Sequence, residues 1–292
     1  MISSKFPIYQ CWNNEAVQQN NGMLFHYTTF ECFISIIKTM SLRSSRISKL
    51  NDMNEGNLDE LNIDKNLPLI IESKRFVGDN CRVVCFSINY KYDGVLFEGY
   101  NHPAMWAHYA DNLEGVCIVI NENKFRNRNH EVFENYFVRF GNVNYGIINA
   151  PEEDDIDYDL TSPQEFIEKN WKKLFLRKHK DWEYEGERRL FIMNYEDDFS
   201  IEGCIESVIL GNRMVQDESK IRLLLEMLID PHNHCYHDLV PASFATVMKG
   251  PVGYYSCELG SLLFDKVREY KGDYNSYLEW LYKVGYVKSM RN

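Results

Sequence analysis

The chain lacks the long apolar stretches of membrane proteins. No apolar run among its 292 residues approaches the length that spans a bilayer, and no basic segment followed by an apolar stretch opens the sequence. The sequence therefore predicts a cytoplasmic protein with no membrane partner.

An excess of positive charge is also missing. Aspartate and glutamate together number 43 against 32 lysines and arginines, which gives a net charge of −11. A non-specific nucleic-acid-binding surface needs a basic patch, so this balance argues against an extended one. A local basic pocket is still compatible with it.

Several motifs of well-known active sites are absent. Without a G-x-G-x-x-G loop, a Rossmann mode of dinucleotide binding is not expected, and without a G-x-S-x-G elbow a serine hydrolase is not expected. The eight cysteines include no C-x-x-C pair. We therefore expect buried free thiols in a reducing compartment.

One polar segment has the residue types of a zinc site. It contains His232, His234, Cys235 and His237 within six residues. A second paired set of ligands is missing, so a histidine-rich polar loop is the favoured interpretation and no metal is predicted.

The apolar patterning predicts an α+β fold, with a split, mainly antiparallel sheet flanked by helices. Helices are expected at residues 29–40 and from Pro163 onwards, and buried strands at 81–87 and 115–120. Residues 131–147 suggest two strands around a Gly141-Asn142 turn. The predicted organisation is an N-terminal extension (1–22), a core domain (23–215) and a mostly helical C-terminal region (216–292).

The stretch Tyr184-Glu185-x-Glu187-x-Arg189 runs directly into an apolar segment. If all of it is extended, Glu185 and Glu187 lie on one face, and such close carboxylates need a positive counter-charge. Arg189 is the expected counter-charge, whereas Lys178 is expected to be solvated unless it faces an anionic ligand. The structural alternative is an exposed edge strand with a ladder of Glu and Arg side chains.

Four separated stretches resemble, in order and spacing, an uncharacterised bacterial domain family. They are Phe25-His26-Tyr27-Thr28, Asn51-Asp52-x-x-Glu55, Cys85-Phe86-Ser87 together with Met105-Trp106-Ala107-His108-Tyr109-Ala110-Asp111, and Tyr184-Glu185-x-Glu187-x-Arg189. The family label itself carries no function.

More distantly, this layout resembles that of ADP-ribosyltransferases. ADP-ribosyltransferases have the same order of strands: an early strand with a histidine, a middle strand that ends in serine, and a late strand with Glu-x-Glu. The resemblance implies that Glu187 is the catalytic carboxylate and Glu185 an accessory one. The residues that it implies along the NAD site are His26, Tyr27, Thr28 and Ser87. Members that begin with histidine usually have a tyrosine where this chain has Ser87.

The implied chemistry suits these residue types. Cleavage of the nicotinamide–ribose bond passes through an oxocarbenium-like state, which a nearby carboxylate stabilises. A neutral histidine can donate to a ribose hydroxyl. The other candidates are Tyr27, Trp106 or Tyr109 for stacking on nicotinamide or adenine, and Arg43 or Arg46 for pairing with the pyrophosphate.

The expected function is therefore an NAD-dependent mono-ADP-ribosyltransferase or NAD glycohydrolase. NAD would be its co-substrate, the acceptor would be an unidentified protein or nucleic acid, and the setting would be a toxin or phage-defence system. The alternative is a non-enzymatic module that binds or senses a nucleotide or peptide. The sequence does not determine the oligomeric state.

Overall fold

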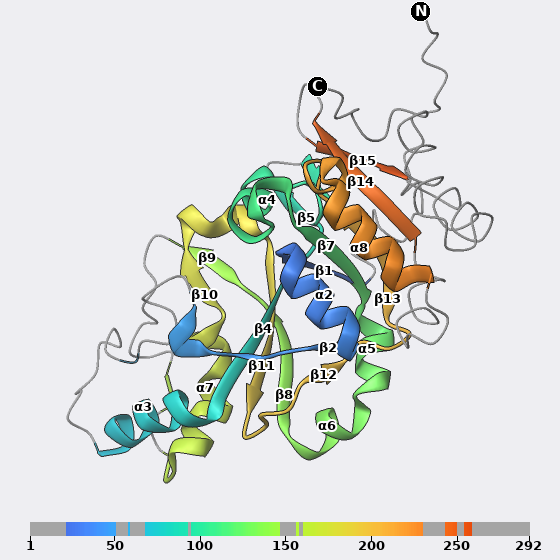
Figure 1. Cartoon of the computed structure of the whole chain (residues 1–292). Helices are drawn as coiled ribbons and strands as arrows, with labels where there is room; N and C mark the ends of the chain where they lie inside the picture. The colour runs from blue at the N-terminus through green and yellow to red at the C-terminus, as the bar shows by residue number, and fades with distance from the viewer. Residues whose placement is uncertain are drawn as a thin grey trace, which may run out of the picture. The chain divides into compact units, whose positions relative to one another are not determined.

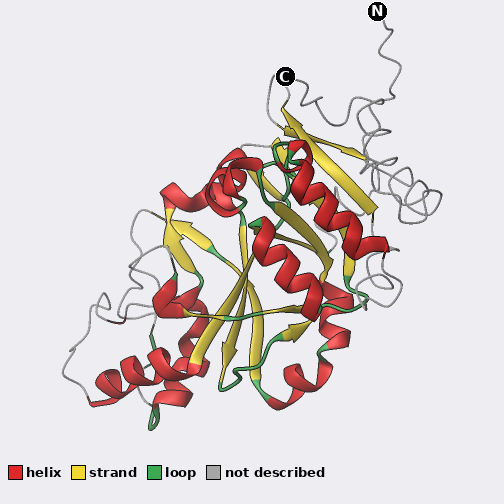
Figure 2. Ribbon diagram, viewed as in Figure 1, coloured by secondary structure: helices red, strands yellow, loops and turns green. Residues whose placement is uncertain are grey.

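The chain folds into helices and mainly antiparallel strands, which confirms the α+β prediction (Figure 2). The computed structural model describes residues 22–50, 58, 68–92, 95–146, 156–157, 160–229, 243–249 and 254–258. The chain divides into two compact units. The first consists of Met1–Ser41, Ile88–Phe125 and Ile201–Asn292, and the second of Leu42–Ser87 and Arg126–Ser200.

The strands of the first unit follow the order β15, β14, β13, β7, β1 (Figure 1). Their bounds are Met23–Thr28 for β1, Val116–Asn121 for β7, Ile205–Leu210 for β13, Ser243–Lys249 for β14 and Tyr254–Glu258 for β15. Only the β13–β14 pair among these is parallel. The interior strand β7 is buried from Val116 to Ile120, as its continuous apolar run predicted.

Helix α2 (Phe30–Thr39) confirms the amphipathic helix expected at residues 29–40. It begins after Thr29, whose hydroxyl accepts a hydrogen bond from the Cys32 backbone N–H, and it ends at Met40 in a left-handed conformation. The other helices and short strands of this unit are α4 (Pro103–Tyr109), η3 (Asp111–Leu113), α5 (Glu122–Arg128, which leads into the second unit), η6 (Met214–Gln216), α8 (Glu218–Ile229), β5 (Tyr90–Tyr92) and β6 (Val95–Phe97).

The turn after α4 is left-handed over three consecutive residues, a conformation that non-glycine residues rarely adopt. Asp111, Asn112 and Leu113 have φ angles of 46°, 52° and 74°. The Leu113 carbonyl accepts from the Arg213 N–H at 3.1 Å, and it lies 2.1 Å from where a Cβ on Gly211 would stand. Glycine at position 211 is therefore a requirement of this turn.

In the second unit, β11 (Glu187–Met193) lies between two antiparallel neighbours. These are β4 (Cys81–Ser87) and β8 (Phe137–Asn142), and β3 (Ser45–Arg46) also pairs with β4. The strand that follows the Y-E-x-E-x-R stretch is thus interior to its sheet. The interpretation of this stretch as a solvated edge strand is wrong.

Two helices, α3 (Pro68–Asn80) and α7 (Pro163–Phe175), cover one face of these strands. Aromatic packing joins α7 to β11, since the Phe191 ring stacks on Phe175 at 4.7 Å and on Trp171 at 5.8 Å. Pro163 does begin α7, and the Ser162 hydroxyl caps it. The remaining elements are β2 (Ser41–Leu42), η1 (Ile47–Lys49), α6 (His130–Asn135), β9 (Asn144–Gly146), β10 (Arg177–His179), η5 (Lys180–Glu185) and β12 (Phe199–Ser200).

Residues 131–147 do contain two strands, β8 and β9, but the turn predicted at Gly141-Asn142 and the strand predicted before residue 137 are wrong. Helix α6 occupies the first part of this range, and Gly141 and Asn142 lie inside β8. A Cβ on Gly141 would come within 2.2 Å of the Leu176 side chain and 3.1 Å of the Trp171 ring. This glycine therefore permits close packing against α7 and its end, where the sequence suggested a turn.

Residues 216–292 contribute α8, β14 and β15 within the described part of the chain. The boundaries proposed at residues 22 and 215 stay a prediction. None of the described helices combines the length and the apolar character that crossing a membrane requires.

Candidate functional site

The Y-E-x-E-x-R stretch changes conformation at Gly186. Glu185 ends the short helix η5, Gly186 adopts a left-handed conformation with φ 50° and ψ 49°, and β11 begins at Glu187. The expectation that both glutamates lie on one strand is therefore wrong. A glycine is suited to this junction because it has no Cβ to clash in that conformation.

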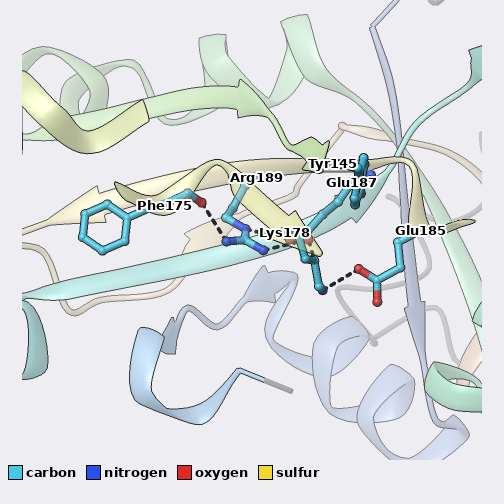
Figure 3. A network of polar contacts seen from close by, with 6 residues as sticks. All are labelled: Tyr145, Phe175, Lys178, Glu185, Glu187 and Arg189. Atoms are coloured by element: carbon cyan, nitrogen blue, oxygen red, sulfur yellow. Dashed lines mark hydrogen bonds and ion pairs between the residues drawn. The ribbon is translucent and has the colours of Figure 1, made fainter. Parts of the chain in front are cut away.

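The two carboxylates nevertheless converge, because Lys178 lies between them (Figure 3). Its Nζ is 2.6 Å from a Glu185 oxygen and 3.6 Å from a Glu187 oxygen. Lys178 is only 4% exposed, and the Trp182 ring lies 4.7 Å from its Nζ. The prediction of a solvated Lys178 is wrong; this lysine is a buried counter-charge.

Arg189 completes the network as predicted. Its Nε and Nη2 donate to the two oxygens of Glu187, each at 2.7 Å, and its Nη1 donates to the Phe175 carbonyl at 2.7 Å. The guanidinium is 1% exposed. Two carboxylates and two cations thus balance within a buried cluster, which is the arrangement that burial of charge requires.

The surroundings of Glu187 keep its carboxylate ionised. Burial by itself would raise its pKa, but the charge and hydrogen bonds of Arg189, the charge of Lys178 and a hydrogen bond from the Cys85 thiol together lower the pKa to about 2. The Tyr145 hydroxyl accepts the Glu187 backbone N–H at 2.8 Å. Burial, followed by the nearby Glu187 charge, raises the pKa of Tyr145, so its hydroxyl stays protonated at neutral pH.

Ser87 lies directly opposite Glu187 in the β4–β11 register. Residues opposite each other in an antiparallel pair project to the same face of the sheet. Ser87 is 1% exposed, and its Oγ has no hydrogen-bond partner in the described part of the chain. The structure therefore brings together Ser87, Glu185 and Glu187, three of the residues predicted for the site.

Three members of the network escaped sequence reasoning, namely Lys178, Tyr145 and Cys85. Each reaches Glu187 through strand pairing or through a contact between separate segments, and local spacing cannot indicate either. The short basic run before Trp182 contains Lys178 and is the one local pattern that pointed to this region. Nothing in that run indicated that the lysine is buried.

The predicted residues of the first unit are mostly packed side chains. The Tyr27 hydroxyl donates to the Gly99 carbonyl at 2.8 Å, its ring meets Trp106 edge to face at 5.2 Å, and burial raises the pKa of that hydroxyl. Trp106 is fully buried and donates through Nε1 to the Tyr100 carbonyl. Contacts of this kind hold α4 against β1.

The other cofactor-binding candidates are placed as follows. Thr28 is buried at the end of β1, whereas His26 and Tyr109 are half-buried. The Arg43 side chain is 87% exposed and lies 3.9 Å from an Asp198 oxygen. A role in NAD binding stays a prediction for each of them.

Within the described ranges, no three His, Cys, Asp or Glu side chains form a group that could hold a metal ion. The histidine-rich segment 231–238 and the stretch Asn51–Glu55 lie outside the described residues.

A domain described as a protein of unknown function (DUF2971) is found at residues 105–190. This confirms the expectation of an uncharacterised domain family. The matched residues include both the Met105–Asp111 and the Tyr184–Arg189 stretches, and they contain every member of the buried charge network except Cys85. No curated protein and no solved structure gave a match.

Proposed function

We propose that the chain is an NAD-dependent ADP-ribosyltransferase-like enzyme that cleaves the nicotinamide–ribose bond. One observation carries the proposal: the buried Glu187 carboxylate, with its pKa lowered to about 2, faces the side of the sheet on which Ser87 has a hydroxyl without a described partner. A carboxylate that is ionised at neutral pH and shielded from water is suited to stabilise an oxocarbenium-like state.

The proposed mechanism assigns a different role to each charged residue. Glu187 stabilises the positive charge that develops on the ribose, and Lys178 and Arg189 keep Glu187 ionised while substrate is absent. Both Glu187 oxygens accept from Arg189 in the described state. One of them must therefore turn toward the ribose when NAD binds. Glu185 would act indirectly, by fixing the position of Lys178.

The test is nicotinamide release from NAD by the purified full-length chain. Wild-type protein should release nicotinamide, and Glu187→Gln should abolish the release. Glu183→Gln serves as the control, because Glu183 lies in the short helix η5 just before β11 and has no role in the proposed mechanism.

Glu187→Gln also removes a partner of Arg189, so a loss of activity could reflect unfolding. Ser87→Ala separates the two effects, since the Ser87 hydroxyl has no described partner to lose. This variant should unfold like wild type but show a raised KM for NAD. A folded wild-type protein that neither binds NAD nor consumes it contradicts the proposal.

A second candidate function is a non-enzymatic module that binds or senses a nucleotide or peptide. It is favoured by the full engagement of Glu187, whose two oxygens already accept from Arg189. Saturable binding of NAD by calorimetry, without any nicotinamide release, would support this alternative over the enzyme.

An effector role in a toxin or phage-defence system is a further part of the proposal. Consumption of NAD would deplete a central metabolite of the cell that contains the enzyme. Growth arrest on expression of wild type, but not of Glu187→Gln, would support this role.

A further inference from the structure

Two arginines lie over the same phenylalanine ring in the second unit. The Arg126 guanidinium carbon is 4.6 Å from the centroid of the Phe140 ring, and that of Arg188 is 5.1 Å from it. Phe133 stacks on Phe140 with centroids 6.1 Å apart and planes inclined by 19°, and Arg126 lies 5.3 Å from the Phe133 centroid. We call Arg126, Phe133, Phe140 and Arg188 the arginine–phenylalanine surface.

The strand register explains how this surface forms. Asn142 is paired with Arg188 and Phe140 with Leu190, so Phe140 and Arg188 project from the same face of the β8–β11 pair. Phe133 reaches Phe140 from α6, the short helix that precedes β8. All four side chains are partly exposed, and β8 is the outermost strand of its sheet among the described strands.

This arrangement concentrates positive charge beside flat apolar rings. Phosphate is a preferred partner of guanidinium groups, which bind it through several N–H donors at once. A guanidinium can stack through its face while its N–H groups donate in the plane to a phosphate. Arg188 already donates to the Asn142 side chain at 2.6 Å, which fixes the orientation of its plane.

We propose that the arginine–phenylalanine surface binds single-stranded nucleic acid. Arg126 and Arg188 would bind backbone phosphates, and unpaired bases would stack on the parts of the aromatic and guanidinium groups that are exposed. Proteins that bind single strands combine these two elements. The chain as a whole has a net charge of −11, which disfavours nucleic-acid binding away from local positive patches such as this one. The proposal goes beyond the NAD chemistry and does not depend on it.

The test is fluorescence anisotropy with a labelled single strand of about 12 nucleotides, as DNA and as RNA, without NAD. Titrations between about 50 and 200 mM salt give the salt dependence. Wild type should bind the strand, and Arg126→Gln and Arg188→Gln should each weaken binding about tenfold and reduce the slope of log affinity against log salt by about 1.

Arg139→Gln is the matched control. Arg139 is an exposed arginine on β8, the strand of Phe140, but its side chain projects to the opposite face, 4.8 Å from the Phe137 ring. Its replacement removes the same amount of charge as the two test variants do. It should leave the affinity nearly unchanged. Arg188→Lys, which keeps the charge but loses the planar group, should bind more weakly than wild type.

Four results would overturn the proposal. One is the absence of binding by folded wild type even at the lowest salt. Another is an equal loss in Arg139→Gln, which would indicate unspecific attraction to any positive charge. The third is tighter binding of a duplex than of the single strand, and the fourth is competition by AMP as effective as that by the unlabelled strand. Either would exclude recognition of a single strand.

Discussion

Replacing Arg189 with methionine should lower the free energy of unfolding by about 3–5 kcal/mol, the usual effect of removing one partner of a buried ion pair. The Glu187 carboxylate is 5% exposed, and the variant leaves it with Lys178, at 3.6 Å, as its one counter-charge among the described residues. The variant also removes the donor to the Phe175 carbonyl. Urea unfolding followed by circular dichroism measures the loss.

Arg188→Met is the control, because Arg188 is the neighbouring arginine on the same strand, projects to the opposite face and is half-buried. It should lose no more than about 1 kcal/mol, the contribution of an exposed cation–π contact. Adding Glu187→Leu to Arg189→Met should restore part of the stability, since Lys178 and Glu185 then balance. Equal losses in the Arg188 and Arg189 single variants would contradict the buried network.

Gly211→Ala should destabilise the first unit by about 3 kcal/mol, at the upper end of the usual cost of overpacking. The added Cβ would lie 2.1 Å from the Leu113 carbonyl oxygen and 2.5 Å from its carbon. Both are backbone atoms of the left-handed turn, and the Arg213 N–H holds the same carbonyl. Relief would therefore require a backbone shift, which thermal and urea unfolding would detect.

Gly78→Ala is expected to change the stability in the opposite direction in the same unfolding experiments. Gly78 lies in α3, and a Cβ there would meet nothing within 4 Å. Alanine should therefore stabilise the protein by about 0.5–1 kcal/mol through its higher helix propensity. A Gly211→Ala variant as stable as wild type would show that the Leu113 turn can rearrange at little cost.

Local patterns predicted the elements whose burial is uniform or strictly periodic. The apolar spacing of α2 and the continuous apolar runs of β4 and β7 each gave the element that the structure shows. The failure at residues 131–147 has a physical cause. Gly141 and Asn142 are residues typical of turns, but the tight contact of Gly141 with Leu176 depends on tertiary packing that a local pattern does not contain.

At the site, sequence reasoning paired Glu187 with Arg189 correctly, because residues two apart on a strand share a face. Sequence reasoning also predicted that Glu185 lies near Glu187, but on the wrong assumption that both are on one strand. The left-handed Gly186 and the buried Lys178, not a continuous strand, produce that proximity. Contacts with Tyr145 and Cys85 arise from partners distant in sequence, so they were beyond prediction from a single chain.

The ionised state of Glu187 links the buried network to the proposed chemistry. Because folding lowers its pKa from 4.5 to about 2, the stabilisation it provides is fully present above pH 4.5 and is lost as the pH falls through about 2. A shift of this size corresponds to a contribution on the order of 3 kcal/mol. Glu187→Gln should therefore be less sensitive to acid than wild type over this range.

The most direct measurement is the titration of the Glu187 carboxyl carbon by NMR, with glutamate labelled and the signal assigned by its absence in Glu187→Gln. The network predicts that this signal stays at its ionised position through pH 4.5 and moves only as the pH approaches about 2. A midpoint near the ordinary value of 4.5 would mean that Glu187 is solvated and unpaired. That result would contradict the buried network and remove the main support for a catalytic Glu187.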